Sequence, residues 1–145
     1  MDRFRLQRVL DYRRQCEENC EHTLRRVQLL HQQEKTRLEA LQTEARGQEE
    51  HLEHIQGAAL APAELQSWQR YHQVLAQRIA AQQDVVAQAA QVVSAQRQQL
   101  LVARQETKVV EKLRDKAKQR YLHELTRREQ RLLDELALTR SRHER

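Results

Sequence analysis

Glycine, proline, cysteine and aromatic residues are all scarce in this chain of 145 residues. It has two glycines, one proline, two cysteines and five aromatic residues. An all-β domain or an α/β enzyme needs many turns, and turns are built largely from glycine, proline and short polar residues. So few turn-forming residues exclude both fold classes.

The sequence also lacks the motifs that assemble catalytic groups. Two glycines, Gly47 and Gly57, cannot form a phosphate-binding loop, and neither a Gly-x-Ser-x-Gly turn nor a His-Glu-x-x-His helix occurs. Cys16, Cys20 and His22 do not share one helix face, so we interpret them as ordinary side chains rather than metal ligands. We expect no catalytic residue, no metal site and no cofactor, and hence no enzymatic activity.

Long apolar runs are missing as well. Seven charged residues in positions 1–14 leave no room for the apolar region of a signal peptide. The longest uncharged stretches, such as 85–96, reach about a dozen residues, whereas a membrane span needs about 20. Cys16 and Cys20 stand one helical turn apart, a spacing that does not suit a disulfide. We therefore expect a cytoplasmic protein with reduced thiols.

The residues that are abundant are those of long helices. Ala, Glu, Lys, Leu and Arg account for 78 positions, and a further 22 are Gln. Such a composition, combined with an apolar repeat every 3.5 residues, is typical of coiled coils. The sequence contains this repeat twice, and we call its positions the seam. In the first half the seam is Leu6, Leu10, Arg13, Glu17, Cys20, Leu24, Val27, His31, Glu34, Leu38, Leu41, Ala45, Gln48, Leu52 and Ile55. In the second half it is Leu65, Trp68, His72, Leu75, Ile79, Gln82, Val86, Ala89, Val93, Gln96, Leu100, Ala103, Thr107 and Val110.

Between the two repeats lies one credible break, residues 57–62. Gly57 suits the C-terminal cap of a helix, and Pro62 suits the first turn of the next helix. Gly47 is a weaker candidate because the seam continues through it. The prediction is an all-α fold, a single coiled-coil domain over residues 1–145. It is an antiparallel hairpin with helix one at about 4–56, a turn at about 57–62 and a longer helix two at about 63–140.

A turn near residue 59 or 60 implies that residue i faces residue 119 − i. This register pairs Leu6 with Leu113, Leu24 with Ala95 and Leu38 with Ala81. Beyond Val110 the register is expected to slip into a frame with Leu122, Leu125, Leu132 and Leu136. That stripe has no counterpart in helix one, so it needs a partner protein or a second copy to cover it.

The net charge of +5 is concentrated in two segments. Residues 1–14 carry +3 and residues 119–145 carry +2, and the hairpin brings both segments to the end opposite the turn. Acidic residues such as Glu124 and Glu129 interleave with the arginines and would repel phosphates, so we expect no nucleic-acid binding. A generic parallel dimer, with residues 57–62 as a kink, is the alternative architecture.

Two segments of the chain resemble a known family. Residues 4–13, Phe-Arg-Leu-Gln-Arg-Val-Leu-Asp-Tyr-Arg, are similar to the start of the FliJ family of flagellar type III export proteins. Residues 129–137, Glu-Gln-Arg-Leu-Leu-Asp-Glu-Leu-Ala, are similar to its C-terminal end. The equivalent stalk of virulence injectisomes is an alternative with the same architecture.

The resemblance implies a non-enzymatic stalk that is monomeric on its own and inserts into the pore of the hexameric export ATPase, FliI. It also implies contacts with the export-gate protein FlhA and with export chaperones, so that the chain reaches the inner face of the cell membrane only through these partners. We expect the ATPase to contact Arg8, Arg13, Arg14, Leu122, Leu125, Arg127, Arg128, Arg131 and Leu132. Carried over from the family pattern, the gate contact includes Leu41, Tyr71 and Leu75.

Overall fold

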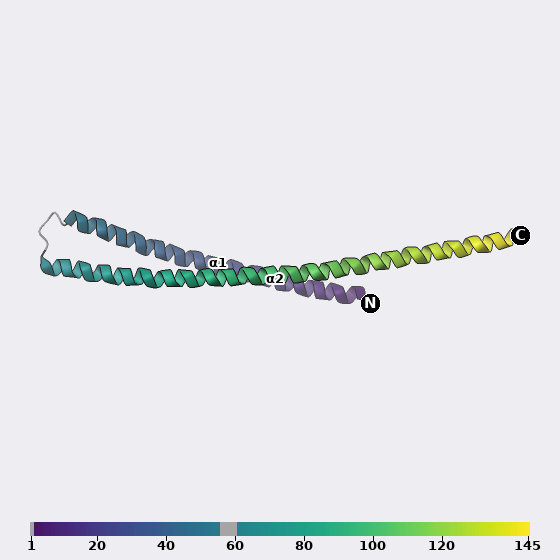
Figure 1. The fold of residues 1–145 in the computed structure, drawn as a ribbon, viewed down its shortest axis with the longest axis horizontal. Coiled ribbons are helices and arrows are strands. Elements are labelled where there is room, and N and C mark those ends of the chain that lie inside the picture. Colours follow the sequence, from purple (N-terminus) through teal and green to yellow (C-terminus); the bar gives the residue numbers. More distant parts are fainter. Residues whose placement is uncertain (1, 56–60) are drawn as a thin grey trace. The chain divides into compact units, whose positions relative to one another are not determined.

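The computed structural model describes residues 2–55 and 61–145, with side chains from residue 5 onward in the first range. Helix α1 extends from Asp2 to Ile55 and helix α2 from Pro62 to His143, and no strand occurs in these ranges (Figure 1). Helix α2, with 82 residues, is longer than α1, with 54. The predicted all-α fold, with two antiparallel helices packed on each other and the second one longer, is confirmed.

The helix ends agree with their local sequence. Helix α2 begins at Pro62, where a missing N–H costs nothing, and the N–H groups of Glu64 and Leu65 donate to the carbonyl of Ala61. Helix α1 continues through Gly47 without a break. Gly57, predicted as a helix cap, lies outside the described residues. In the described part of the chain, no helical stretch is long and apolar enough to cross a membrane.

The chain divides into two compact units. The terminal unit comprises residues 2–19 of α1 and 101–145 of α2, and the middle unit comprises the described residues between 20 and 100. In each unit, α1 residues with higher numbers contact α2 residues with lower numbers. Each unit is therefore an antiparallel helix pair, which excludes the alternative of a parallel dimer with a kink.

Burial follows the predicted seam. All fifteen seam positions of α1 are buried or half-buried, and so are twelve of the fourteen in α2, where Leu65 and His72 are exposed. Leu10, with 0% of its surface exposed, is the centre of the terminal unit, and Leu75, with 1%, is the centre of the middle unit. A narrow seam of this kind buries few residues fully, because two helices cover each other on one side only.

Several polar side chains in the seam are paired with a residue of the other helix. In the terminal unit Arg13 lies 2.5 Å from Glu106, and Arg104 Nε lies 3.5 Å from Glu17 Oε1. In the middle unit the Gln82 amide donates to the Glu34 carboxylate at 2.6 Å and to the Glu34 carbonyl at 3.0 Å. Such pairs fix the register of a coiled coil, because a shifted helix would leave a charge facing apolar neighbours.

The predicted pairing of residues between the two helices is right overall, but two of its details are wrong. Arg13 and Glu106 satisfy the predicted relation in which residue i faces 119 − i. However, Ala81, Ala95 and Leu113 are exposed beside the seam rather than in it, since the exact register depends on the turn and not on the apolar repeat. The predicted slip after Val110 is also misplaced, because Arg114 and Ala117 continue the repeat and are half-buried.

Candidate protein-docking surfaces

Residues 118–143 of α2, here called the α2 extension, lie beyond the last position of the repeat that α1 covers. Figure 1 shows this part of α2 continuing past the beginning of α1. Of the predicted ATPase contacts here, Leu122 and Leu132 are exposed and Leu125 is half-buried. Further large exposed side chains in the extension are Tyr121, Leu133, Leu136 and Leu138. The extension thus presents apolar surface that no described residue outside it covers.

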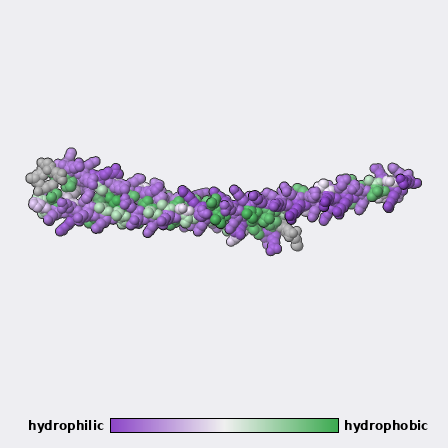
Figure 2. Space-filling view, in the orientation of Figure 1, coloured by the Kyte–Doolittle hydropathy of each residue, from purple (hydrophilic) through white to green (hydrophobic). Residues whose placement is uncertain are grey.

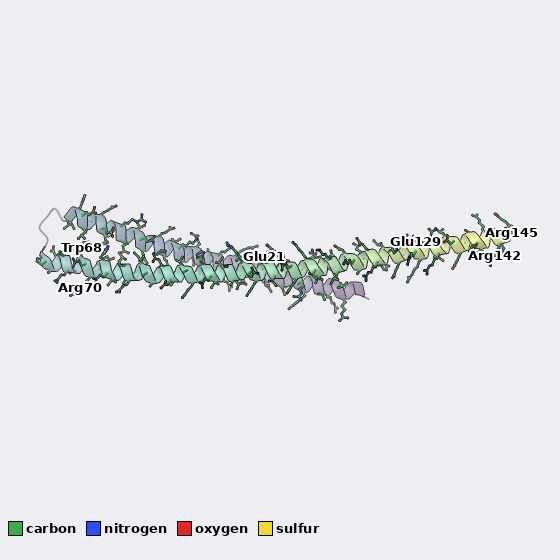
Figure 3. The ribbon with its side chains drawn as sticks, viewed as in Figure 1. Glu21, Trp68, Arg70, Glu129, Arg142 and Arg145 are labelled. Carbon is green, nitrogen blue, oxygen red and sulfur yellow. The ribbon has the colours of Figure 1, made fainter. Side chains whose placement is uncertain are left out.

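The leucines and arginines of the α2 extension point to different sides of the helix. At about 100° per residue, Leu122, Leu125 and Leu132 fall within an arc of roughly 80°. Measured from the centre of that arc, Arg128 is rotated by roughly 70° and Arg127 by roughly 170°. Figure 3 shows side chains standing out from both edges of this part of α2. A flat partner surface could therefore contact either the leucines or Arg127, but not both.

The predicted basic residues differ in whether they already have partners. Arg13 is paired with Glu106, and Arg14 Nη2 lies 3.6 Å from Glu111 Oε1. Arg8 is exposed but also has an interaction of its own. Arg127, Arg128 and Arg131 are exposed and make no ion pair with any described residue. Their charges are consequently available to an acidic partner, whereas Arg13 and Arg14 contribute first to the helix pair itself.

In the middle unit, the predicted gate contacts are unequally accessible. Tyr71 is exposed, Leu41 is half-buried in the seam, and Leu75 is buried between the helices. A partner could touch Tyr71 directly. Leu41 and Leu75 could influence such a contact only indirectly, by fixing the spacing of α1 and α2.

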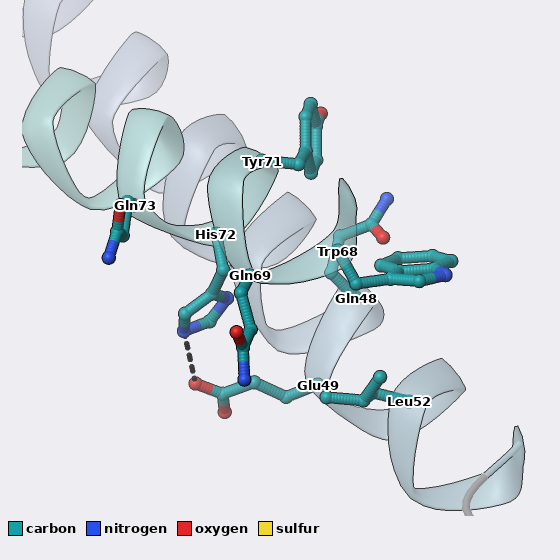
Figure 4. A pocket seen from close by; sticks show the side chains of 8 residues that line it. All are labelled: Gln48, Glu49, Leu52, Trp68, Gln69, Tyr71, His72 and Gln73. Carbon is teal, nitrogen blue, oxygen red and sulfur yellow. Dashed lines mark ion pairs between the residues drawn. The ribbon is translucent and has the colours of Figure 1, made fainter. Parts of the chain in front are cut away.

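Tyr71 stands at the rim of a shallow groove between the two helices (Figure 4). The groove has a volume of about 320 Å³ and is lined by Trp68, Tyr71 and His72 from α2 and by Gln48, Glu49 and Leu52 from α1. His72 Nε2 lies 3.6 Å from Glu49 Oε1 across its opening. The Trp68 ring is half-buried and tilted by 51° against the His51 ring, with centroids 5.4 Å apart.

A hydrogen bond across the helices orients Tyr71. Its hydroxyl donates to the Glu44 carboxylate, and this bond, together with partial desolvation, raises the pKa of Tyr71 above its ordinary value. The positive charge of Arg78 nearby acts to lower the pKa of Tyr71. The phenol therefore stays protonated over the whole physiological range and holds the ring in place as a donor.

Sequence reasoning did not identify Glu44 as the partner of Tyr71. The signal was present, because the 119 − i register places Glu44 opposite Leu75, one helical turn from Tyr71. Within the described residues no cluster of three or more His, Cys, Asp or Glu side chains could hold a metal ion. Cys16 and Cys20 are free thiols and both are half-buried, Cys20 in the seam and Cys16 beside it.

Comparisons with known proteins give one match. The family model described as "Flagellar FliJ protein" matches residues 1–145 of the chain. No curated protein and no solved structure matches.

Proposed function

Because the chain belongs to the FliJ family and is therefore a component of the flagellar export apparatus, we propose that it acts as a coiled-coil stalk of this apparatus. In this proposal the α2 extension docks in the pore of the export ATPase hexamer, FliI. The middle unit contacts the export-gate protein FlhA. The family consists of non-enzymatic components, so the stalk acts on its partners by binding them.

The observation that carries the proposal is the distribution of side chains around the α2 extension. Leu122, Leu132 and Leu136 are exposed on one side, and the unpaired Arg127 and Arg131 stand on other sides of the same helix. A partner that uses both must surround the helix, and a ring of six subunits around a central pore has this geometry. Leu122, Leu125 and Leu132 would pack against apolar pore residues, while Arg127, Arg128 and Arg131 would attract acidic ones.

Docking in a ring suggests how the stalk influences the ATPase. A helix that is apolar on one side and basic on other sides cannot contact six identical subunits equally. Subunits in different nucleotide states would then bind the stalk with different affinities, and only such a difference can shift their populations. Hexamer assembly and nucleotide turnover are the two processes that this effect would favour.

The gate contact is assigned to the groove beside Tyr71. Exposed aromatic residues next to a groove are favoured positions for strong protein contacts, and the bond to Glu44 reduces the side-chain entropy that binding would cost. Leu41 and Leu75 support this surface from the seam. Export chaperones complete the set of proposed partners, and the chain would reach the inner face of the membrane only through such contacts.

The test is a triple substitution, Leu122→Ser, Leu132→Ser and Leu136→Ser, in the full chain. All three side chains are exposed, so helix content and unfolding temperature should stay close to those of the parent. Binding to the purified export ATPase, measured by titration calorimetry, should weaken at least tenfold, and stimulation of ATP hydrolysis should be lost.

The matched control is Val74→Ser, Val85→Ser and Val92→Ser, which removes three exposed apolar side chains from the middle unit. It should bind the ATPase like the parent chain. If the two variants lost affinity equally, or if neither did, docking through the α2 extension would be wrong.

A further inference from the structure

A second apolar stripe runs along α2 beside the seam. If seam positions are labelled a and d of a heptad, positions c and g lie on one side of it and positions b and e on the other. In the terminal unit the c and g positions of α2 include Val102, Val109 and Leu113, all of them exposed. Those of α1 include Val9 and Tyr12, which are exposed as well. These five side chains are here called the flank patch.

The two halves of the flank patch lie on the same side of the helix pair. Arg14 and Glu111 both occupy e positions, and their side chains approach to 3.6 Å. In an antiparallel pair this contact brings the two e sides together, so the two g sides meet on the opposite side. Figure 2 shows hydrophobic side chains gathered where the beginning of α1 lies beside α2. The flank patch is therefore one surface made by both helices.

The charges around the flank patch have one sign. Over residues 5–19 and 101–120, the basic residues at positions c, f and g are Arg5, Arg8, Lys112, Lys116 and Arg120. The only acidic residue at these positions is Glu106, and its carboxylate is already paired with Arg13. Position f lies at the back of each helix and borders both sides, so the opposite side is counted over positions b, e and f, which carry six basic and four acidic residues. The excess of positive charge is therefore larger beside the apolar stripe (+4, here called the basic rim) than on the opposite side (+2).

We propose that the flank patch binds an amphipathic helix of another protein whose apolar stripe is bordered by acidic residues. An apolar row with a 3.5-residue repeat fits a helix, because a third helix packed along two others repeats its contacts with the same period. The basic rim favours Glu and Asp beside the contact and disfavours a second copy of this chain, whose own flank patch carries the same positive charge. This surface is separate from the leucines of the α2 extension, so the inference goes beyond ATPase docking.

The middle unit supplies an internal comparison. There the stripe continues on α2 with Val74, Val85 and Val92. Over residues 20–55 and 62–100, however, positions c, f and g of the two helices carry four basic and four acidic residues, so the stripe has no excess of positive charge beside it. An acidic helix should therefore prefer the terminal unit, even though apolar surface is available in both.

The test uses two synthetic helical probes of about four heptads with Leu at a and d. One probe has Glu and the other Lys at its flanking positions, and each is titrated with the full chain by fluorescence anisotropy. The Glu probe should bind at least tenfold more tightly than the Lys probe, and its affinity should fall as salt rises from about 50 to about 300 mM. Equal affinity for both probes, or no binding of the Glu probe at low salt, would overturn the proposal.

Substitutions then locate the site. The variant Val109→Ser with Leu113→Ser should weaken binding of the Glu probe at least tenfold, whereas Val85→Ser with Val92→Ser should leave it unchanged. All four side chains are exposed, and circular dichroism of both variants checks that the helices are intact. An equal loss in both variants would show nonspecific apolar binding and would contradict the inference.

Two other occupants would give different results. If light scattering shows a dimer that Val109→Ser with Leu113→Ser converts to a monomer, the patch is an interface between two copies of this chain. If the same variant loses export ATPase affinity at least tenfold, the patch belongs to the ATPase contact. Either result overturns the proposal of an acidic partner helix, and neither depends on whether the α2 extension docks in the pore.

Discussion

Arg13 and Glu106 lie 93 positions apart in the chain, yet the guanidinium of one is 2.5 Å from the carboxylate of the other. This contact joins α1 to α2 in the terminal unit. Arg13 occupies a seam position, so the ion pair also determines which residues of the two helices face each other. Both side chains are partly exposed, which limits how much the pair stabilises the fold.

We expect Arg13→Glu alone and Glu106→Arg alone to destabilise the helix pair, each by about 1 kcal/mol, because like charges would then face each other. The double exchange should recover about half of the loss or more. Urea unfolding followed by circular dichroism measures all three variants, and strictly additive losses would show that the two residues do not interact in solution.

Leu10 and Leu132 should respond very differently to truncation. Leu10→Ala leaves a cavity in the centre of the terminal unit and should cost about 2 to 4 kcal/mol of unfolding free energy. Leu132 is 59% exposed, so Leu132→Ala should stay within about 0.5 kcal/mol of the parent chain. Thermal unfolding of both proteins makes the comparison. Similar losses would mean that the α2 extension is covered in the free protein.

The Gln82–Glu34 pair should be replaceable as a unit but not in part. Gln82→Leu removes one of two donors to a half-buried carboxylate, which keeps Arg37 Nη1 at 3.1 Å, and should cost about 1 kcal/mol. Gln82→Leu combined with Glu34→Leu should be at least as stable as the parent, because apolar residues then meet in the seam. The register should become less specific, which disulfide trapping between cysteines introduced on the two helices would detect as additional cross-linked species.

Gly47 should be a site of easy stabilisation. It lies within α1, and a Cβ atom added there would have no other atom within 4 Å. Gly47→Ala should therefore raise the unfolding free energy by about 0.5 to 1 kcal/mol through helix propensity alone. A rise in the thermal midpoint checks this prediction, and a decrease would indicate a helix break at Gly47 in solution.

The bond between Tyr71 and Glu44 should be visible in a pH titration. The carboxylate raises the pKa of Tyr71, so Glu44→Gln should shift it back toward the ordinary value. Because a raised pKa favours the protonated phenol in the folded state, the stabilisation is complete below the ordinary pKa. It disappears as the pH rises through the raised one. Ultraviolet difference absorbance, with Tyr12 and Tyr121 replaced by Phe, measures Tyr71 alone.

The apolar repeat was sufficient to predict which residues meet between the helices. The seam from Leu6 to Val110 follows from spacing alone, since only one side of each helix can face the other. Spacing could not fix the pairing to a single residue, as Ala81 and Ala95 illustrate, because that depends on turn geometry. Spacing also placed Leu75 between the helices but could not predict how completely it is covered, which depends on how closely the surrounding side chains pack.

Most contacts between individual polar side chains could not be predicted from the sequence. The bond from Tyr71 to Glu44 requires particular side-chain conformations on two helices, and a helical period carries no information about them. The flank patch is an intermediate case. Each of its five residues stands one position before a residue of the repeat, so the pattern could have been recognised once the seam was known.

The single-helix part of α2 has a consequence for how binding can be observed. Residues 118–143 contain no glycine or proline, yet their backbone amides are shielded only by the turns of their own helix. Isolated helical segments open locally at little energetic cost, so these amides should take up deuterium rapidly in the unbound chain. Slow uptake would then have to be conferred by another molecule, which makes exchange in this segment a direct measure of occupancy within the assembled export machine.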